Sequence, residues 1–132
     1  MRKTIRTRFL ILVLPLTALL ALGCPPPPPN LTPQGLRAFQ ATRVITALDQ
    51  LRDTAIAANA QVPPLISTAT TRVIVTYHKA ALLTIQSDTS NGWVVAVKTG
   101  LDQVVATLPP KEATVVAPYV TLVETILTAV TQ

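Results

Sequence analysis

The sequence predicts an all-α protein: a small antiparallel four-helix bundle that follows an N-terminal signal peptide and a polyproline spacer. Three observations predict this fold. Apolar side chains recur mostly every three or four residues in four segments between residues 31 and 132. Proline pairs at 63–64 and 109–110 and the cluster Ser90-Asn91-Gly92 separate these segments. Connections this short place consecutive helices side by side in opposite directions.

The first predicted helix runs from about residue 33 to 60. Thr32 is a favourable N-cap residue, and Pro33 suits the first helical position. The expected core side chains of this helix are Leu36, Phe39, Ile45, Leu48, Leu51, Ala55 and Ile56. Charged side chains lie mostly off this stripe, so we expect a solvated face made by Arg37, Arg43, Asp49, Arg52 and Asp53.

The second segment, around residues 70–77, is rich in β-branched residues and would suit a strand in isolation. We favour a helix because no second segment of matching character is available to pair with such a strand. Ser67 or Thr68 can cap the helix. Its expected core stripe has helical spacing and consists of Ile74, Tyr77, Ala81 and Ile85.

The third predicted helix spans about 92–108 and has the most regular stripe in the chain. The stripe consists of Trp93, Val94, Val97, Leu101, Val104, Val105 and Leu108. Gly100 inside this helix costs up to ~1 kcal/mol relative to alanine. It marks either a close contact with another helix or simple tolerance. Lys98 and Asp102 are spaced for an ion pair across one helical turn.

The fourth predicted helix follows the second proline pair and continues to residue 130. Glu112 falls in its first turn, where the helix dipole favours an acidic side chain. Pro118 removes one backbone hydrogen bond, so we expect a kink near residues 114–118 or a separate short first turn. The expected core stripe is Val116, Val120, Val123, Ile126, Leu127 and Val130.

The net charge of +5 belongs to the N-terminus. Four of the eleven basic residues lie within residues 2–8, which leaves seven basic against six acidic side chains in the rest of the chain. The sequence contains no phosphate-binding loop and no basic patch interleaved with aromatic residues. We therefore expect no nucleic-acid partner.

Residues 1–23 have the layout of a secretory signal peptide. A basic segment precedes the apolar run 9–22, which ends at the small residue Gly23. A transmembrane anchor is the alternative interpretation. However, a run of 14 residues is shorter than the ~20 that a bilayer requires, and Pro15 interrupts it. We expect cleavage between Gly23 and Cys24, and export of the remainder.

A cysteine directly after this cleavage point resembles a bacterial lipoprotein precursor. Of the residues before the cysteine, Gly23 fits the pattern of that family closely, whereas Ala21 and Leu22 depart from it. The resemblance implies that Cys24 receives acyl chains such as palmitate and anchors the protein to a bacterial membrane, facing the periplasm or the cell surface. Ordinary secretory cleavage after Ala21-Leu22-Gly23 would cut the same bond and leave a free thiol.

Residues 24–30 are then the lipidated cysteine and its linker, and residues 31–132 are the helical domain. Five consecutive prolines, residues 25–29, favour an extended polyproline II segment of ~3.1 Å per residue. Such a segment would hold the domain about 15 Å from the lipid headgroups. A ligand for a proline-binding domain is the alternative interpretation.

The sequence offers little material for catalysis or metal binding. His78 is the only histidine, and we expect it to lie off the core stripe without partners. A metal site needs three or four protein ligands, and the only cysteine, Cys24, is more than fifty residues away. Asp49 and Asp53, with Arg52 between them, favour an ion-pair patch over a catalytic dyad. We expect no catalytic residues, no metal and no cofactor.

These features favour a non-enzymatic, lipid-anchored protein of the cell envelope, in which the helical domain binds a protein partner or has a structural role. A phage-encoded lysis protein is the alternative, because a short lipoprotein with prolines after the cysteine resembles the outer-membrane spanin subunit. A single-chain spanin would need a second membrane anchor, and Pro118, Glu124 and four threonines interrupt residues 113–130. An enzyme with an unrecognised carboxylate site is a third reading. Residues 30–60 faintly resemble small proteins of environmental phages and bacteria, which implies no activity.

Overall fold

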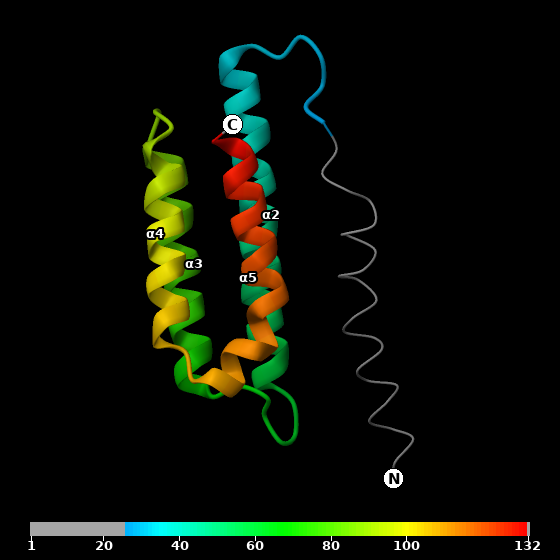
Figure 1. Ribbon diagram of the computed structural model, residues 1–132, viewed down its shortest axis with the longest axis vertical. Coiled ribbons are helices and arrows are strands. Elements are labelled where there is room, and N and C mark those ends of the chain that lie inside the picture. Colours follow the sequence, from blue (N-terminus) through cyan, green and yellow to red (C-terminus); the bar gives the residue numbers. More distant parts are fainter. Residues whose placement is uncertain (1–25, 132) are drawn as a thin grey trace.

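The computed structural model describes residues 26–131, and these residues form four helices and no strand. The helices are α2 (Pro33–Asn59), α3 (Thr68–Ser87), α4 (Gly92–Thr107) and α5 (Pro110–Val130). Consecutive helices run in opposite directions (Figure 1). The predicted all-α bundle is therefore confirmed. The predicted signal peptide, its cleavage site and Cys24 lie outside the described residues.

The four helices form a ring in which each packs against the next along the chain. α2 packs closely against both α3 and α5, and α3 packs closely against α4. The contact between α4 and α5 is less extensive. The described N-terminal residues and the end of α5 lie at one end of the bundle, and the connection between α2 and α3 lies at the other (Figure 1).

The buried face of α2 follows a regular spacing of three and four residues. Thr32 caps the helix by accepting a hydrogen bond from the backbone N–H of Gly35, and Pro33 occupies the first turn, as predicted. The expected core position of Ile56 is wrong, because its side chain is 47% exposed. The stripe instead passes through neighbouring positions and contains Ala41, Val44, Ala47, Leu48, Leu51, Thr54, Ala55 and Ala58. Alanine at four of these positions lets the neighbouring helices approach closely.

The segment rich in β-branched residues is helical, as predicted. Ser67 is the N-cap residue of α3, and its hydroxyl accepts a hydrogen bond from the backbone N–H of Thr70. All four expected core residues of this helix are buried. The Tyr77 hydroxyl donates to the Val97 carbonyl of α4 at 2.8 Å. Burial, and to a lesser degree the charge of Asp102, raises the pKa of the Tyr77 phenol.

Gly100 marks a close contact between α3 and α4, which decides between the two interpretations of its sequence position. A Cβ atom at residue 100 would lie 3.0 Å from Cε2 of Tyr77. The rest of the α4 stripe is largely as predicted, although Val105 is 36% exposed. Asn91 precedes α4 without making a side-chain cap bond. In the same turn, hydrogen bonds from the Ser90 hydroxyl and N–H hold the pKa of Asp88 below its usual value.

Helix α5 is continuous from residue 110 to 130, with Pro118 inside it. Its first part crosses the end of the bundle where α2 and α3 are connected, and the helix then turns along the bundle axis (Figure 1). This bend agrees with the kink that Pro118 predicts. The residues of α5 that are buried against the other helices are Val116, Tyr119, Leu122, Val123, Ile126 and Leu127.

Glu112 joins the start of α5 to the start of α3. Its carboxylate accepts hydrogen bonds from the Ser67 backbone N–H at 3.1 Å and from the Ser67 hydroxyl at 3.2 Å. It also accepts a short hydrogen bond from the Thr70 hydroxyl. The N-terminus of a helix carries partial positive charge, so a carboxylate there is favourable. Glu112 therefore acts in the first turn of its own helix, as expected, and also caps a second helix.

We expect Glu112→Ala to lower the free energy of unfolding by about 1–3 kcal/mol, because it removes a charged acceptor from three donors. Urea unfolding followed by circular dichroism measures this change. Glu124→Ala is the matched control, since its carboxylate accepts no hydrogen bond among the described residues and the helix is the same. Equal destabilisation by the two substitutions would contradict the assigned role of Glu112.

We expect Gly100→Val to destabilise the bundle by about 1–3 kcal/mol, because the added side chain collides with the Tyr77 ring. Thermal unfolding of this variant is compared with that of Ala96→Val, which places valine on an exposed position of the same helix. The control accounts for the lower helix propensity of valine. If Gly100→Val lowered thermal stability no more than the control, α3 and α4 could move apart at residue 100 without loss of stability.

Candidate functional site

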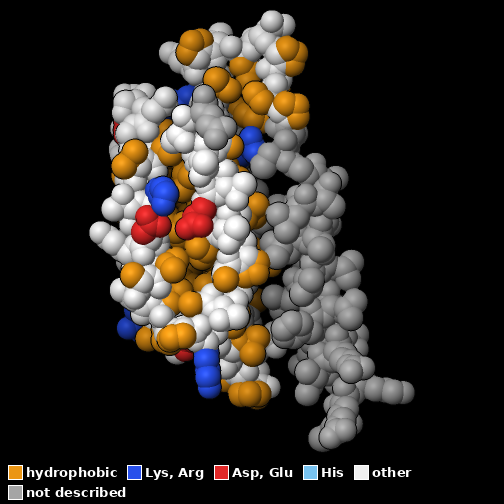
Figure 2. All heavy atoms as spheres, in the orientation of Figure 1, with side chains coloured by type: hydrophobic (Ala, Val, Ile, Leu, Met, Phe, Trp, Pro, Cys, Tyr) orange, Lys and Arg blue, Asp and Glu red, His pale blue; other side chains and the backbone are white. Residues whose placement is uncertain are grey.

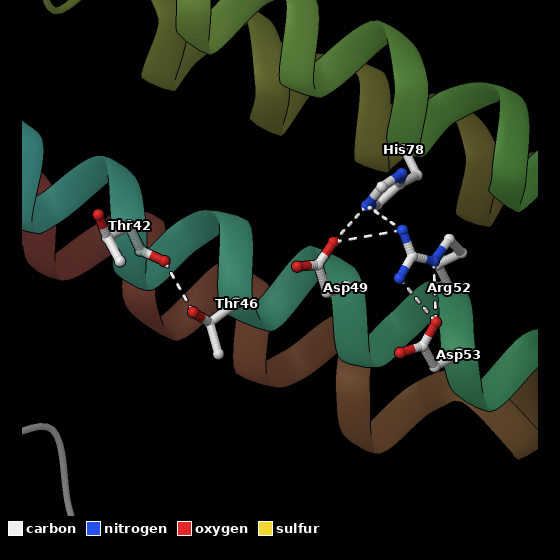
Figure 3. A network of polar contacts seen from close by, with 6 residues as sticks. All are labelled: Thr42, Thr46, Asp49, Arg52, Asp53 and His78. Carbon is white, nitrogen blue, oxygen red and sulfur yellow. Dashed lines mark hydrogen bonds and ion pairs between the residues drawn. The ribbon is translucent and has the colours of Figure 1, made fainter.

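Four ionisable side chains meet between α2 and α3 (Figure 3). Asp49, Arg52 and Asp53 come from α2, and His78 comes from α3. His78 Nε2 lies 2.7 Å from Asp49 Oδ1, and Arg52 Nη1 lies 3.5 Å from the same oxygen. The other side of the Arg52 guanidinium contacts Asp53 Oδ1 at 2.8 Å. Arg52 therefore lies between two carboxylates, as the predicted ion-pair patch requires.

His78 lies at the buried end of this cluster and Asp53 at its exposed end. His78 is 4% exposed, whereas the Asp49 and Arg52 side chains are partly exposed. The expectation that His78 lacks partners is wrong. Its partner Asp49 is 29 residues earlier and on another helix, so only the packing of α2 against α3 brings the two side chains together.

The geometry determines which histidine nitrogen carries a proton. A carboxylate can only accept hydrogen bonds, so His78 Nε2 must donate to Asp49. Arg52 Nη1, which lies 3.4 Å from His78 Nε2, is a donor as well, so it pairs with the Asp49 carboxylate as an ion pair at 3.5 Å and not with the histidine. Two donors from two helices thus converge on one carboxylate. The cluster joins α2 to α3 through a polar contact at the edge of the apolar core.

The described residues do not assemble a nucleophile around this histidine. No hydroxyl among them forms a hydrogen bond with His78, and the Thr46 hydroxyl near the cluster donates to the Thr42 carbonyl (Figure 3). No group of three or more histidine, cysteine, aspartate or glutamate side chains in residues 26–131 has a geometry that could hold a metal ion. Gly23 and Cys24, the predicted cleavage and lipidation residues, lie outside this range.

Two arginines of the predicted solvated face of α2 make specific contacts instead. Arg37 Nη2 donates to the Ile85 carbonyl at 3.2 Å, near the end of α3. The last carbonyls of a helix lack partners within that helix and carry partial negative charge, so a cation there is favourable. The Arg43 guanidinium lies 5.8 Å from the centre of the Phe39 ring. The Arg37 contact joins α2 to α3, whereas the Arg43 contact lies within α2.

Helix α5 has one property that bears on location. By length and composition alone, α5 could cross a membrane, and 33% of its most apolar stretch is buried inside the bundle. Core helices of bundles commonly share this property.

No protein-family model, no curated protein and no solved structure matches this chain. The interpretation of the site therefore rests on its geometry.

We expect the Asp49–His78 contact to be energetically coupled. Asp49→Ala and His78→Ala should each destabilise the protein by about 1–3 kcal/mol, and the double variant should lose less than the sum by about 0.5–2 kcal/mol. A double-mutant cycle measured by urea unfolding tests this. The control cycle uses the exposed pair Lys98 and Asp102, which lie 3.1 Å apart and should show a coupling below about 0.5 kcal/mol. Coupling between Asp49 and His78 as weak as that of the control would contradict the assigned role of His78.

Proposed function

We propose that the protein is exported and lipid-anchored through Cys24, and that its helical bundle acts in the bacterial cell envelope by binding a protein partner, without catalysis. The main support is the arrangement of the chain on either side of residue 30. The lipoprotein-like segment precedes it, and a bundle with its own apolar core, which begins at Ala41, follows it.

The connection between these two parts supports a tethered domain. Residues 26–34 are exposed and contribute nothing to the core. Asn30 has a φ of 73°, a left-handed conformation that asparagine adopts more readily than most residues, and it turns the chain into α2. The bundle thus follows a short proline-rich segment that makes no contact with its core.

A membrane anchor would allow the bundle to act through a partner that it binds only weakly. A lipid on Cys24 confines the domain to a thin layer and raises its effective concentration towards envelope partners. The linker spans about 15 Å, and a helix as long as the 27-residue α2 adds about 40 Å. Partners within that distance of the membrane are accessible. The polar cluster at His78 is engaged in pairing within the bundle, which agrees with a role for the surface rather than for this cluster.

A phage-encoded lysis protein is the second candidate. The observation that favours it is the apolar character of α5, which could provide a second membrane attachment. Against it, α5 buries Val116, Tyr119 and Val123 within the bundle. The two candidates differ in whether the protein remains membrane-bound when its lipid is removed.

We expect the mature protein to begin at Cys24 and to carry acyl chains, which intact mass spectrometry detects. Cys24→Ser should shift the protein from the membrane fraction to the soluble fraction, because carbonate extraction releases proteins that have neither a lipid anchor nor a membrane-spanning segment. Wild-type protein extracted in the same way is the control. A mature wild-type chain with an unmodified thiol would refute lipidation. A Cys24→Ser protein that resists carbonate extraction would instead support membrane insertion by α5.

A further inference from the structure

The connection between α2 and α3 projects from the end of the bundle that is remote from the N-terminal linker (Figure 1). We refer to residues 60–67 as the foot loop. Its tip consists of four consecutive apolar residues, Val62-Pro63-Pro64-Leu65, and all four are exposed. Val62 is 94% exposed, the largest value among the exposed large apolar side chains of the described chain, and Leu65 is 45% exposed.

The base of the foot loop is held firmly on both sides. The Leu65 N–H donates to the Ala58 carbonyl at 3.0 Å, and the Asn59 side-chain amide donates to the Ile66 carbonyl at 3.1 Å. Ile66 is buried in the core, and Glu112 binds Ser67. The fold therefore holds the apolar tip in water. Exposure of this apolar surface is energetically unfavourable.

The backbone of the tip has few donors that need an acceptor. Pro63 and Pro64 have no backbone N–H, and the N–H of Leu65 is already bonded to Ala58. A polar backbone group that leaves water without a partner is costly. The carbonyl groups of the tip therefore need to stay near water or lipid headgroups, while the apolar side chains can enter the bilayer. This arrangement suits shallow insertion at a membrane surface.

The charges around the foot loop favour an anionic surface. Arg72 in α3 and Lys111 in α5 are both exposed and form no ion pair within the described residues. The acidic side chains nearest this end are already engaged: Glu112 with Ser67 and Thr70, and Asp53 with Arg52. A basic side chain projects at the foot of the molecule beside apolar side chains (Figure 2).

We propose that the foot loop is a membrane-contact site, which inserts Val62 and Leu65 into an anionic lipid bilayer while Arg72 and Lys111 contact lipid phosphates. The tip is far smaller than the ~800 Å² that each partner contributes to a stable protein interface. A bilayer needs no complementary shape and accepts a narrow apolar wedge. The site does not depend on the lipid at Cys24 and goes beyond the proposed function, since its ligand is lipid.

The test uses the expected mature chain, residues 24–132, with Cys24→Ser, which removes both the lipid and the native thiol. Val62→Cys then provides a single position for a nitroxide spin label. In vesicles of one part phosphatidylglycerol to three parts phosphatidylcholine, the label should gain accessibility to oxygen and lose accessibility to a water-soluble nickel complex. The matched control is Leu83→Cys, because Leu83 is also exposed, at 66%, but lies towards the opposite end of α3. That label should remain accessible to nickel.

Charge dependence provides the second arm. Each basic side chain near an anionic surface contributes about 1 kcal/mol, so the combined change Arg72→Gln and Lys111→Gln should raise the lipid concentration for half-insertion of the residue 62 label about 30-fold. Circular dichroism confirms that each variant is folded. The proposal is overturned if the residue 62 label stays accessible to nickel, if the residue 83 label inserts equally, or if insertion is unchanged in pure phosphatidylcholine.

Discussion

The packing of α2 against α3 joins the two halves of the bundle, and the rest of the architecture depends on it. α5 packs on α2 and α4 packs on α3, whereas the direct contact between α4 and α5 is the least extensive in the ring. Both helices contribute buried apolar residues to the common core, among them Leu48 and Leu51 of α2 and Ile74 of α3. At its edge, Asp49 accepts a hydrogen bond from His78 and forms an ion pair with Arg52, so a polar contact joins the two helices beside the apolar core.

The helices could be predicted because the residues that mark their ends are close to those ends in the sequence. The caps Thr32 and Ser67 and the two proline pairs place the helix ends within about one or two residues of those observed. Ile56 was misplaced because the buried stripe of α2 follows alternating steps of three and four through Ala55 and Ala58. The contacts of His78 and Glu112 join residues 29 or more positions apart, and no local pattern in the sequence encodes such partners.

The two ends of the bundle differ in chemistry. The linker end holds the residues that precede α2, and the other end holds the foot loop and two exposed basic side chains. The polar cluster lies between them, where it serves the packing of helices. A distance of about 40 Å, the length of a helix such as α2, therefore separates the linker end from the foot loop.

Helix α4 is held at its ends by fewer interactions than the other helices. It has neither a side-chain N-cap bond nor an acidic residue in its first turn, whereas α2 and α3 have a side-chain cap and α5 has Glu112. Its contact with α5 is also the least extensive in the ring. The buried face of α4 therefore holds it in place, and the fully buried Trp93 lies at the start of that face. Because Trp93 is the one tryptophan of the sequence, its fluorescence would report a local opening of α4.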